Sequence, residues 1–352
     1  MHRRQFLQGT AASALALSFP GFSGTFKTQR MGIVVHSYAS RWQAKTPSAR
    51  FPAFANALDL LEHCHQIGAG GVQVTVNGWA EDFAKKMRDA REKMGLYLEG
   101  SIGLPRDEGD VARFDGEVRR AREAGAQILR TVTLGTRRYE TFRTAPEFEA
   151  FRKKSLRSIQ LAEPVARKHG VKLAVENHKD WRSGELAAIL KPLSSEWVGA
   201  TIDFGNNLAL LEDPTDVVQT LAPYALSTHI KDMAVEPYAD GFLLSEVPLG
   251  KGILDLPKLV SICRASNPAV TFSLEMITRD PLQIPCLKDD YWATFGDLPG
   301  RDLARTLRLV RDKKSPSPLP RVAGLSTDEK VETEEANILA CLAYSREALS
   351  MV

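Results

Sequence analysis

The chain has 352 residues, of which 43% are hydrophobic and 25% are charged, and its formal net charge is only +3. These values are ordinary for a globular protein, and this length can bury a large core in one or two domains. A small charge without a basic block gives nucleic acid or an anionic membrane surface little electrostatic attraction. The four cysteines are scattered without a Cys-x-x-Cys pair, which argues against a zinc ribbon and leaves a single disulfide open.

The first residues resemble a bacterial twin-arginine (Tat) export signal. Arg3 and Arg4 precede Phe6 and a short apolar stretch that extends to about Phe19. This stretch is shorter than the roughly 20 apolar residues that cross a bilayer, so we expect no stable membrane insertion. We predict a signal peptide over about residues 1–24 and a protein exported to the periplasm. The alternative interpretation is a disordered basic N-terminus.

Eight short apolar runs predict strands that alternate with helices. The predicted strands span residues 31–36, 72–76, 95–99, 126–133, 171–176, 198–203, 225–229 and 270–275. Most of the intervening segments carry apolar residues at helical spacing, and predicted helices span residues 51–67, 81–94, 110–124, 146–169, 183–190, 256–265 and 302–312, with one more starting at Asp213. This alternation favours a (β/α)8 TIM barrel over an open doubly wound sheet. No Gly-x-Gly-x-x-Gly follows a strand, which argues against dinucleotide binding.

The remaining segments are predicted as connections and a terminal helix. Glycine, proline and irregular patterns predict a loop over residues 232–254, a loop over residues 281–299 and a linker over residues 316–320. Residues 326–349 read as a helix that becomes rich in leucine and alanine. We therefore expect the barrel over residues 31–313, followed by a linker and an extended C-terminal helix over residues 314–352.

Four of the predicted strands end in a residue that can bind a metal ion. These residues are Glu176, Asp203, His229 and Glu275. The carboxyl ends of barrel strands meet at one edge, so we expect the four side chains to converge. Each alone could be a helix cap or a core histidine, but four in successive βα units indicate a site. This oxygen-rich set with one imidazole suits one divalent ion, Mn²⁺, Mg²⁺ or Co²⁺, and Zn²⁺ less strongly.

The motifs around these residues resemble the xylose isomerase-like family of sugar isomerases and epimerases. They read Val-Glu176-Asn-His178, Ile-Asp203-Phe-Gly-Asn206, Thr-His229-Ile-Lys231-Asp232 and Leu-Glu275. The resemblance lies in the order of the four motifs and covers roughly residues 31–313. It implies a TIM barrel that binds one metal ion through Glu176, Asp203, His229 and Glu275, with both glutamates also acting as the acid/base pair. The related endonuclease-IV-like barrels bind three zinc ions through many more histidines than the seven found here.

A second set of residues near the strand ends is predicted to contact the substrate. This set comprises His36, Glu99, Arg130, His178, Asn206 and Lys231. Ordinary polar rim residues are an equal alternative for all six. If both glutamates only bind the metal, Lys231 or His178 would move protons instead. Three aromatic residues in nearby loops could support a sugar ring or pack a lid: Trp181, Tyr291 and Trp292.

The resemblance and the export signal together imply an exported, metal-dependent isomerase or epimerase that enolises a carbohydrate. Phosphorylated sugars are chiefly cytoplasmic and no Gly-rich phosphate cradle is visible, so we expect a non-phosphorylated or oxidised (keto) carbohydrate. A lyase or dehydratase of a keto-sugar or keto-glycoside is the main alternative, and a non-catalytic sugar-binding barrel is the second. We expect no nucleic-acid partner, and the sequence is compatible with a homo-oligomer.

Overall fold

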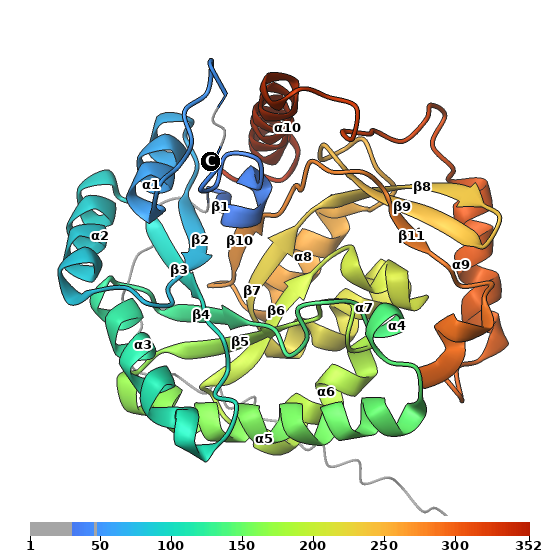
Figure 1. Ribbon diagram of the computed structural model, residues 1–352, viewed down its shortest axis with the longest axis horizontal. Helices are drawn as coiled ribbons and strands as arrows, with labels where there is room; N and C mark the ends of the chain where they lie inside the picture. Colours follow the sequence, from blue (N-terminus) through green and yellow to red (C-terminus); the bar gives the residue numbers. More distant parts are fainter. Residues whose placement is uncertain (1–29, 46–47) are drawn as a thin grey trace, which may run out of the picture.

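The computed structural model of the protein describes residues 30–45 and 48–352. Within them, eight parallel strands close into a barrel in the order β1-β10-β7-β6-β5-β4-β3-β2, and helices surround it (Figure 1). This architecture is a TIM barrel, which confirms the predicted fold class. The predicted export signal at Arg3 and Arg4 lies outside the described residues.

The barrel strands are short and almost entirely buried. They are β1 (Gly32–Val34), β2 (Gly71–Thr75), β3 (Tyr97–Ser101), β4 (Ile128–Thr131), β5 (Lys172–Glu176), β6 (Val198–Asp203), β7 (Ala225–Ile230) and β10 (Thr271–Leu274). Each overlaps a predicted strand, because a strand covered on one side by barrel side chains and on the other by helices is apolar along its length. The register pairs Asp203 with His229 and His229 with Ser273, which brings neighbouring strand ends to the same edge.

The outer layer consists of helices that follow the strands in sequence. They are α1 (Ala57–Gln66), α2 (Glu81–Met94), α3 (Val111–Glu123), α4 (Arg138–Thr141), α5 (Ala145–His169), α6 (Ser183–Leu193), α7 (Pro214–Leu221), α8 (Leu256–Ser266) and α9 (Gly300–Asp312). Helix α5 starts with a capping box between Thr144 and Glu147 and ends at Gly170, whose φ is 63°. Glycine adopts this left-handed conformation without strain, so the chain can turn directly from α5 into β5.

The segment 232–254, predicted as a loop, is mainly a β-hairpin. Strands β8 (Asp232–Tyr238) and β9 (Gly241–Val247) pair antiparallel, and β11 (Leu282–Ile284) from the second predicted loop completes a three-stranded sheet beside α9 (Figure 1). The loop prediction was wrong because Gly241, read as a sign of a loop, instead allows a close approach between strands. A Cβ on Gly241 would lie 2.2 Å from the backbone oxygen of Ile284, so close pairing with β11 requires glycine.

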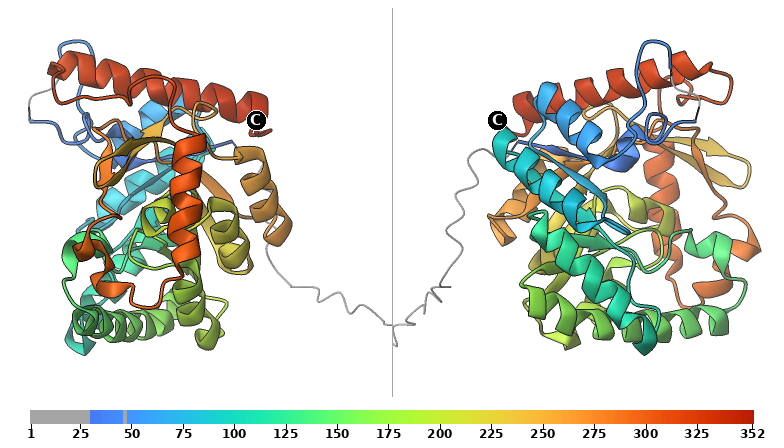
Figure 2. Two further views of the ribbon diagram at one scale, coloured as in Figure 1. Left: turned by 90° about the vertical axis from the view of Figure 1, so that its right-hand side faces the viewer. Right: turned by 60° about the vertical axis from the view of Figure 1, so that its left-hand side comes forward.

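The predicted terminal helix is confirmed as α10 (Thr327–Ala348), which starts with a capping box at Ser326. It packs against the 3₁₀ helix η1 (Val35–Tyr38) that follows β1, and it contacts α1 through His63 (Figure 2). Glu335 in α10 lies 2.7 Å from the Arg41 guanidinium and 3.0 Å from His63. All four cysteines lie in the described part of the chain and are free and buried, so none forms a disulfide. None of the described helices is long and apolar enough to span a bilayer.

Asp232, at the start of β8, fixes the loop that follows β9. Its carboxylate accepts backbone N–H bonds of 2.9 to 3.1 Å from Met233, Gly250, Gly252 and Leu254. The carboxylate is fully buried, so removing it leaves several donors without a partner.

We expect Asp232→Ala to lower the free energy of unfolding by about 2–4 kcal/mol, because buried N–H groups lose their acceptor. Urea denaturation followed by circular dichroism would measure the change. Asp240→Ala is the matched control, since Asp240 forms an exposed ion pair with Lys288 and its removal should cost less than about 1 kcal/mol. Equal midpoints for the two variants would contradict this role of Asp232.

Candidate metal centre and active site

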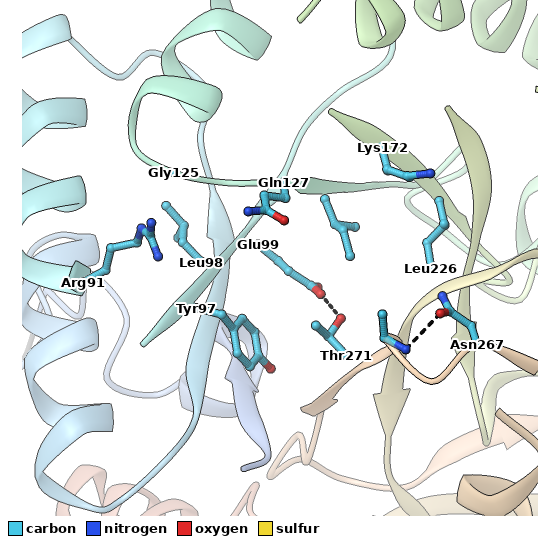
Figure 3. Close-up of a pocket in the computed structure, with 12 residues that line it drawn as sticks. Arg91, Tyr97, Leu98, Glu99, Gly125, Gln127, Lys172, Leu226, Asn267 and Thr271 are labelled. Atoms are coloured by element: carbon cyan, nitrogen blue, oxygen red, sulfur yellow. Dashed lines mark hydrogen bonds between the residues drawn. The ribbon is translucent and has the colours of Figure 1, made fainter. Parts of the chain in front are cut away.

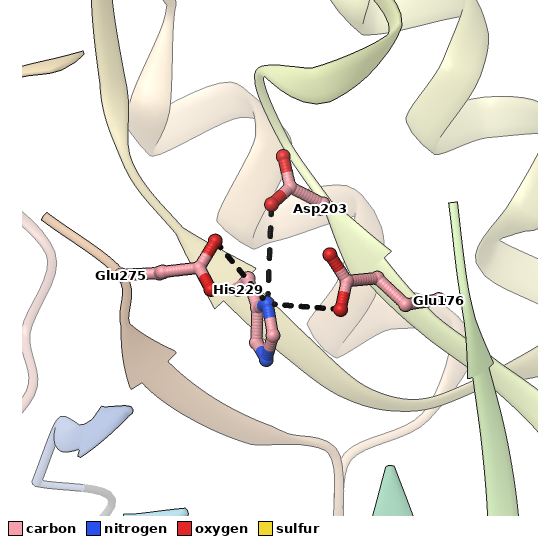
Figure 4. A group of neighbouring side chains, drawn as sticks. All are labelled: Glu176, Asp203, His229 and Glu275. Atoms are coloured by element: carbon pink, nitrogen blue, oxygen red, sulfur yellow. Dashed lines mark ion pairs between the residues drawn. The ribbon is translucent and has the colours of Figure 1, made fainter. Parts of the chain in front are cut away.

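Four side chains meet at the carboxyl-terminal end of the barrel (Figure 4). Glu176 ends β5, Asp203 ends β6, His229 lies in β7 and Glu275 directly follows β10. All four are buried, and one potential ligand atom from each lies within 4.8 Å of the others. The structure therefore brings together the four residues that the sequence predicts as metal ligands.

The His229 ring indicates how well this cluster fits a cation. Its Nδ1 atom is buried and has no hydrogen-bond partner among the described residues. This atom lies 3.5 Å from Glu176 Oε2, 3.6 Å from Glu275 Oε2 and 3.9 Å from Asp203 Oδ2 (Figure 4). Three carboxylate oxygens and one imidazole nitrogen that converge in this way are suitable ligands for a divalent metal ion. The cluster could therefore bind such an ion.

Two basic side chains balance the negative charge of the carboxylates. Lys231 Nζ lies 2.7 Å from Asp203 Oδ2 and 2.6 Å from Glu275 Oε2. Arg130 Nε donates to Glu176 Oε2 at 2.5 Å. Because a buried carboxylate without a partner is costly, these cations make the convergence of three carboxylates tolerable.

The same contacts determine which groups are charged. Burial raises the pKa of Glu176, but Arg130 and His229 outweigh it and hold that pKa well below its usual range. Burial also raises the pKa of Glu275, but Lys231 and His229 outweigh it and hold that pKa well below its usual range. Burial lowers the pKa of His229, yet the two glutamates overcome it and raise the pKa to about 10. A metal ion that binds Nδ1 must therefore displace a proton at neutral pH.

Further hydrogen bonds hold the ligand carboxylates in orientation. Asp203 Oδ1 accepts from the backbone N–H groups of Gly205 and Asn206 at 2.9 and 2.8 Å. The Asn206 side chain donates to Glu176 Oε1 at 3.1 Å. His36 Nδ1 lies 3.1 Å from Glu275 Oε1. Such outer contacts fix ligand geometry and commonly affect metal affinity by 10- to 100-fold.

Five of the six predicted substrate-contacting residues lie around this cluster. Arg130, Asn206 and Lys231 contact the ligand carboxylates directly, so the structure gives them a supporting position at the metal centre. His36 is half-exposed beside Glu275. His178, two residues after Glu176, lies within electrostatic reach of Glu176 and Glu275.

His178 is held in one tautomer by the backbone. Its Nδ1 lies 3.0 Å from the carbonyl oxygen of Leu134, which requires an N–H at Nδ1 and leaves Nε2 as an acceptor. Burial lowers its pKa to about 4, so the ring is neutral at physiological pH. A neutral imidazole at this place can accept a proton or a hydrogen bond from a substrate hydroxyl.

Glu99 lies elsewhere than the sequence predicts. Its carboxylate accepts a hydrogen bond from Gln73 at 2.7 Å inside the barrel, and Gln73 separates it from His229. The expectation that Glu99 lines the substrate pocket does not agree with this position. The residue faces the barrel interior because it sits in the middle of β3 rather than at its carboxyl end.

The sequence reasoning missed two residues next to Glu176. Asn177 links the ends of β5 and β6, because its side chain donates to the Asp203 carbonyl and accepts from the Asp203 N–H, both at 2.9 Å. Lys179 is buried, has a φ of 66° and donates to Asn206 Oδ1. Burial and the nearby Lys231 lower the pKa of Lys179 to about 8. The sequence signal that could have identified Asn177 and Lys179 is their place directly after Glu176 in the chain.

The β8–β9 hairpin contributes a buried ion pair that the sequence did not predict. Glu246 in β9 is buried and pairs with Arg279, whose Nε lies 3.1 Å from Glu246 Oε2. This ion pair lies within electrostatic reach of Lys179 and Lys231. The prediction of a loop over this segment hid it, because a loop glutamate is normally exposed.

Two of the three aromatic residues, Trp181 and Tyr291, do not form a platform for a sugar ring. Trp181 is buried, stacks on Phe151 with ring centroids 5.1 Å apart, and donates its N–H to Thr133. Tyr291 is also buried, and its hydroxyl donates to the carbonyl oxygen of Ala209 at 2.8 Å. Both therefore pack the protein interior, whereas Trp292 is half-buried and donates its N–H to the carbonyl oxygen of Cys286 at 3.0 Å.

A closed (β/α)8 barrel with a Glu-Asp-His-Glu cluster at its carboxyl end defines the class of protein, a TIM barrel with a site for a divalent metal ion. A model of the xylose isomerase-like TIM barrel family matches residues 61–293. The chain belongs to this family.

Similar proteins cover most of the chain. The 3-oxo-isoapionate decarboxylase of Pectobacterium atrosepticum is 25% identical over 271 residues, which cover 74% of this chain and 92% of the decarboxylase. A crystal structure of the IOLI protein with a binding zinc atom has 15% identity and a TM-score of 0.55, covering 89% of this chain and 98% of its own. The structure of an L-ribulose 3-epimerase has 14% identity and a TM-score of 0.55, and the match covers 91% of this chain and 96% of the epimerase chain. These structural similarities concern the fold.

We expect binding of a divalent ion to release about one proton per ion, because His229 is protonated below a pKa of about 10. Isothermal titration of Mn²⁺ into chelator-treated protein, in buffers of different ionisation enthalpy, would count the protons. Affinity should rise about tenfold for each pH unit between pH 6 and 8. Asp203→Ala should weaken binding more than 100-fold, whereas His65→Ala, an exposed control, should not change it. Binding of Mn²⁺ without proton release would contradict the role of Nδ1.

Proposed function

We propose that this protein is a divalent-metal-dependent isomerase or epimerase that enolises a non-phosphorylated, oxidised (keto) carbohydrate. The observation that carries the proposal is the pair of ionised glutamates that approach His229 from two sides within one buried cluster (Figure 4). Membership of the xylose isomerase-like family and the similarity of fold to an L-ribulose 3-epimerase support a carbohydrate substrate.

The chemistry begins with a carbon acid next to a carbonyl group. Glu176, Asp203, His229 and Glu275 would hold a divalent ion, whose positive charge would polarise this carbonyl. One glutamate takes the proton from the adjacent carbon, and the other returns a proton to the opposite face, which inverts the centre. His36 is half-exposed and lies 3.1 Å from Glu275 Oε1, so a proton on Glu275 can exchange with solvent.

The charges around the site favour an anionic substrate. Four basic side chains match four carboxylates in this region, namely Arg130, Lys179, Lys231 and Arg279 with Glu176, Asp203, Glu246 and Glu275. A divalent ion adds a net positive charge to this balanced set. An enolate, or a substrate that carries a carboxylate, would neutralise it, which supports an oxidised sugar.

The main alternative is a lyase. The same enolising site could expel a leaving group from the β-carbon of a keto-sugar, or stabilise the enolate formed when a β-keto acid loses carbon dioxide. The 25% identity to a 3-oxo-isoapionate decarboxylase over 74% of this chain favours this alternative. The two reactions share the metal and the proton-transferring residues and differ in the bond that breaks.

Mass spectrometry distinguishes these reactions. Mn²⁺-loaded protein would be incubated in deuterium oxide with keto-sugars, keto-sugar acids and keto-glycosides. An isomerase or epimerase keeps the elemental composition of its substrate and introduces deuterium. A lyase releases water, carbon dioxide or an aglycone. Affinity for a sugar without turnover or exchange across the panel would favour the non-catalytic sugar-binding barrel.

We expect Glu176→Gln and Glu275→Gln to slow exchange of the substrate's α-hydrogen with solvent deuterium by at least about 100-fold, because glutamine keeps an oxygen donor but removes the base. Exchange would be followed by NMR, with metal content measured in each variant. The exposed Glu149→Gln serves as a control that should exchange at the wild-type rate. A Gln variant that retains metal and exchanges at the wild-type rate is not the base, and Lys231 or His178 would then be tested.

We further propose that the protein reaches the periplasm through the Tat pathway, on the basis of Arg3 and Arg4 ahead of a short apolar stretch. The double variant Arg3→Lys/Arg4→Lys should accumulate in the cytoplasm, as measured by cell fractionation and immunoblotting. Arg30→Lys lies beyond the predicted signal and should be exported normally. Periplasmic recovery of the double variant at the wild-type level would refute the signal.

A further inference from the structure

The barrel interior below the metal cluster is polar, although such interiors are usually filled by branched apolar side chains. Gln73 in β2 and Glu99 in β3 are 1% and 2% exposed. They are direct neighbours in the strand register, so both side chains point into the barrel. Ser227 in β7 and Thr271 in β10 form a second neighbouring pair across from them. A buried carboxylate at this place is costly and needs a compensating role.

Hydrogen bonds connect this layer to the metal cluster. Glu99 Oε2 accepts from Gln73 Nε2 at 2.7 Å and from Ser227 Oγ at 3.1 Å, while Thr271 Oγ1 donates to Glu99 Oε1. On the other side, Gln73 Oε1 lies 2.8 Å from His229 Nε2. One glutamine side chain thus joins the buried carboxylate to a predicted metal ligand.

Three donors surround the Glu99 carboxylate and favour its ionised form, for which the order of donors and acceptors along this chain is determined. An ionised carboxylate can only accept, so Glu99 draws the NH₂ group of Gln73 toward itself. The amide oxygen of Gln73 then faces His229, which must present an N–H at Nε2. In the neutral ring this leaves the lone pair on Nδ1, the atom that faces Glu176 and Glu275.

We propose that Glu99 is a positioning residue that acts through Gln73 to hold His229 in the tautomer whose Nδ1 binds the metal ion. This inference rests on the proposed metal centre and gives Glu99 a role other than substrate contact. It also explains why three donors surround a carboxylate in the barrel interior.

A cavity at the opposite end of the barrel gives experimental access to Glu99 (Figure 3). Its volume is about 280 Å³, and residues that begin β3 and β5, Tyr97 and Lys172, line it together with Glu99 and Thr271. Figure 3 shows the Glu99 carboxylate bonded to Thr271 at this cavity. A small anion could enter here to replace a truncated Glu99 side chain.

The first test is Glu99→Gln in the full-length protein. The new amide can donate to Gln73 Oε1, which lets Gln73 turn its NH₂ group toward His229 Nε2. Nε2 must then accept, so even the neutral ring keeps its proton on Nδ1, where it competes with the metal. We expect Zn²⁺ affinity, measured by competition with a chromophoric chelator, to fall about 10- to 100-fold. Thr271→Val is the matched control. It removes another hydrogen bond to Glu99 but leaves the Gln73 bond intact, so affinity should stay within about twofold.

Long-range ¹H–¹⁵N spectra of the Zn²⁺-loaded protein report the tautomer directly. The His229 signals are those missing in His229→Gln. They should show the proton on Nε2 in the wild type and a mixture of ring states in Glu99→Gln at partial loading. A purely structural effect of the substitution would lower stability without changing the protonated nitrogen.

The second test is chemical rescue of Glu99→Ala. Formate should restore at least part of the Zn²⁺ affinity, because it can enter the cavity and accept from Gln73. Formamide, which is of similar size but can donate, should not. Wild-type affinity and an unchanged tautomer in Glu99→Gln, or equal effects of formate and formamide, would overturn this inference alone. A wild-type protein that binds no divalent ion would overturn the metal centre as well, whereas inactivity toward every sugar would affect only the proposed function.

Discussion

Three carboxylates converge on one imidazole in a buried pocket, and the surrounding basic side chains compensate the electrostatic cost of that convergence. The repulsion among Glu176, Asp203 and Glu275 is strong in a medium of low dielectric constant. Arg130 and Lys231 offset it from neighbouring strands, each through short contacts to a carboxylate oxygen. Such a balanced cluster is held in place before any ligand arrives, which suits it to bind a divalent ion with little rearrangement.

Elements outside the barrel hold the groups around this cluster. Helix α10 packs on η1, which carries His36 toward Glu275. Glu335 in α10 also forms a buried ion pair with Arg41, which lies just after η1. The β8–β9 hairpin carries Glu246, which adds a carboxylate within reach of Lys231. Helix α10 and the β8–β9 hairpin therefore contribute to the electrostatics of the site.

If the site enolises its substrate as proposed, the substrate determines the outcome of the reaction. Once a proton has left the carbon next to a polarised carbonyl, the enolate can be reprotonated on the other face or can lose a β-substituent. In that proposal, the half-exposed His36 would let a proton on Glu275 exchange with solvent in either case. The residues that carry the proton transfers are thus common to isomerase and lyase, and the substrate's leaving group distinguishes the two.

The sequence by itself determined the barrel and the four predicted ligands, because both depend on local patterns. A buried parallel strand is recognisable from its apolar run, and a ligand at its end is the next residue in the chain. Only the closed barrel decided which side chains meet across its interior, as Gln73 and Glu99 meet the His229 and Thr271 side chains. The tertiary structure also decided that Trp181 packs inward against Phe151 and that Gly241 lies against β11, since each depends on a partner distant in sequence.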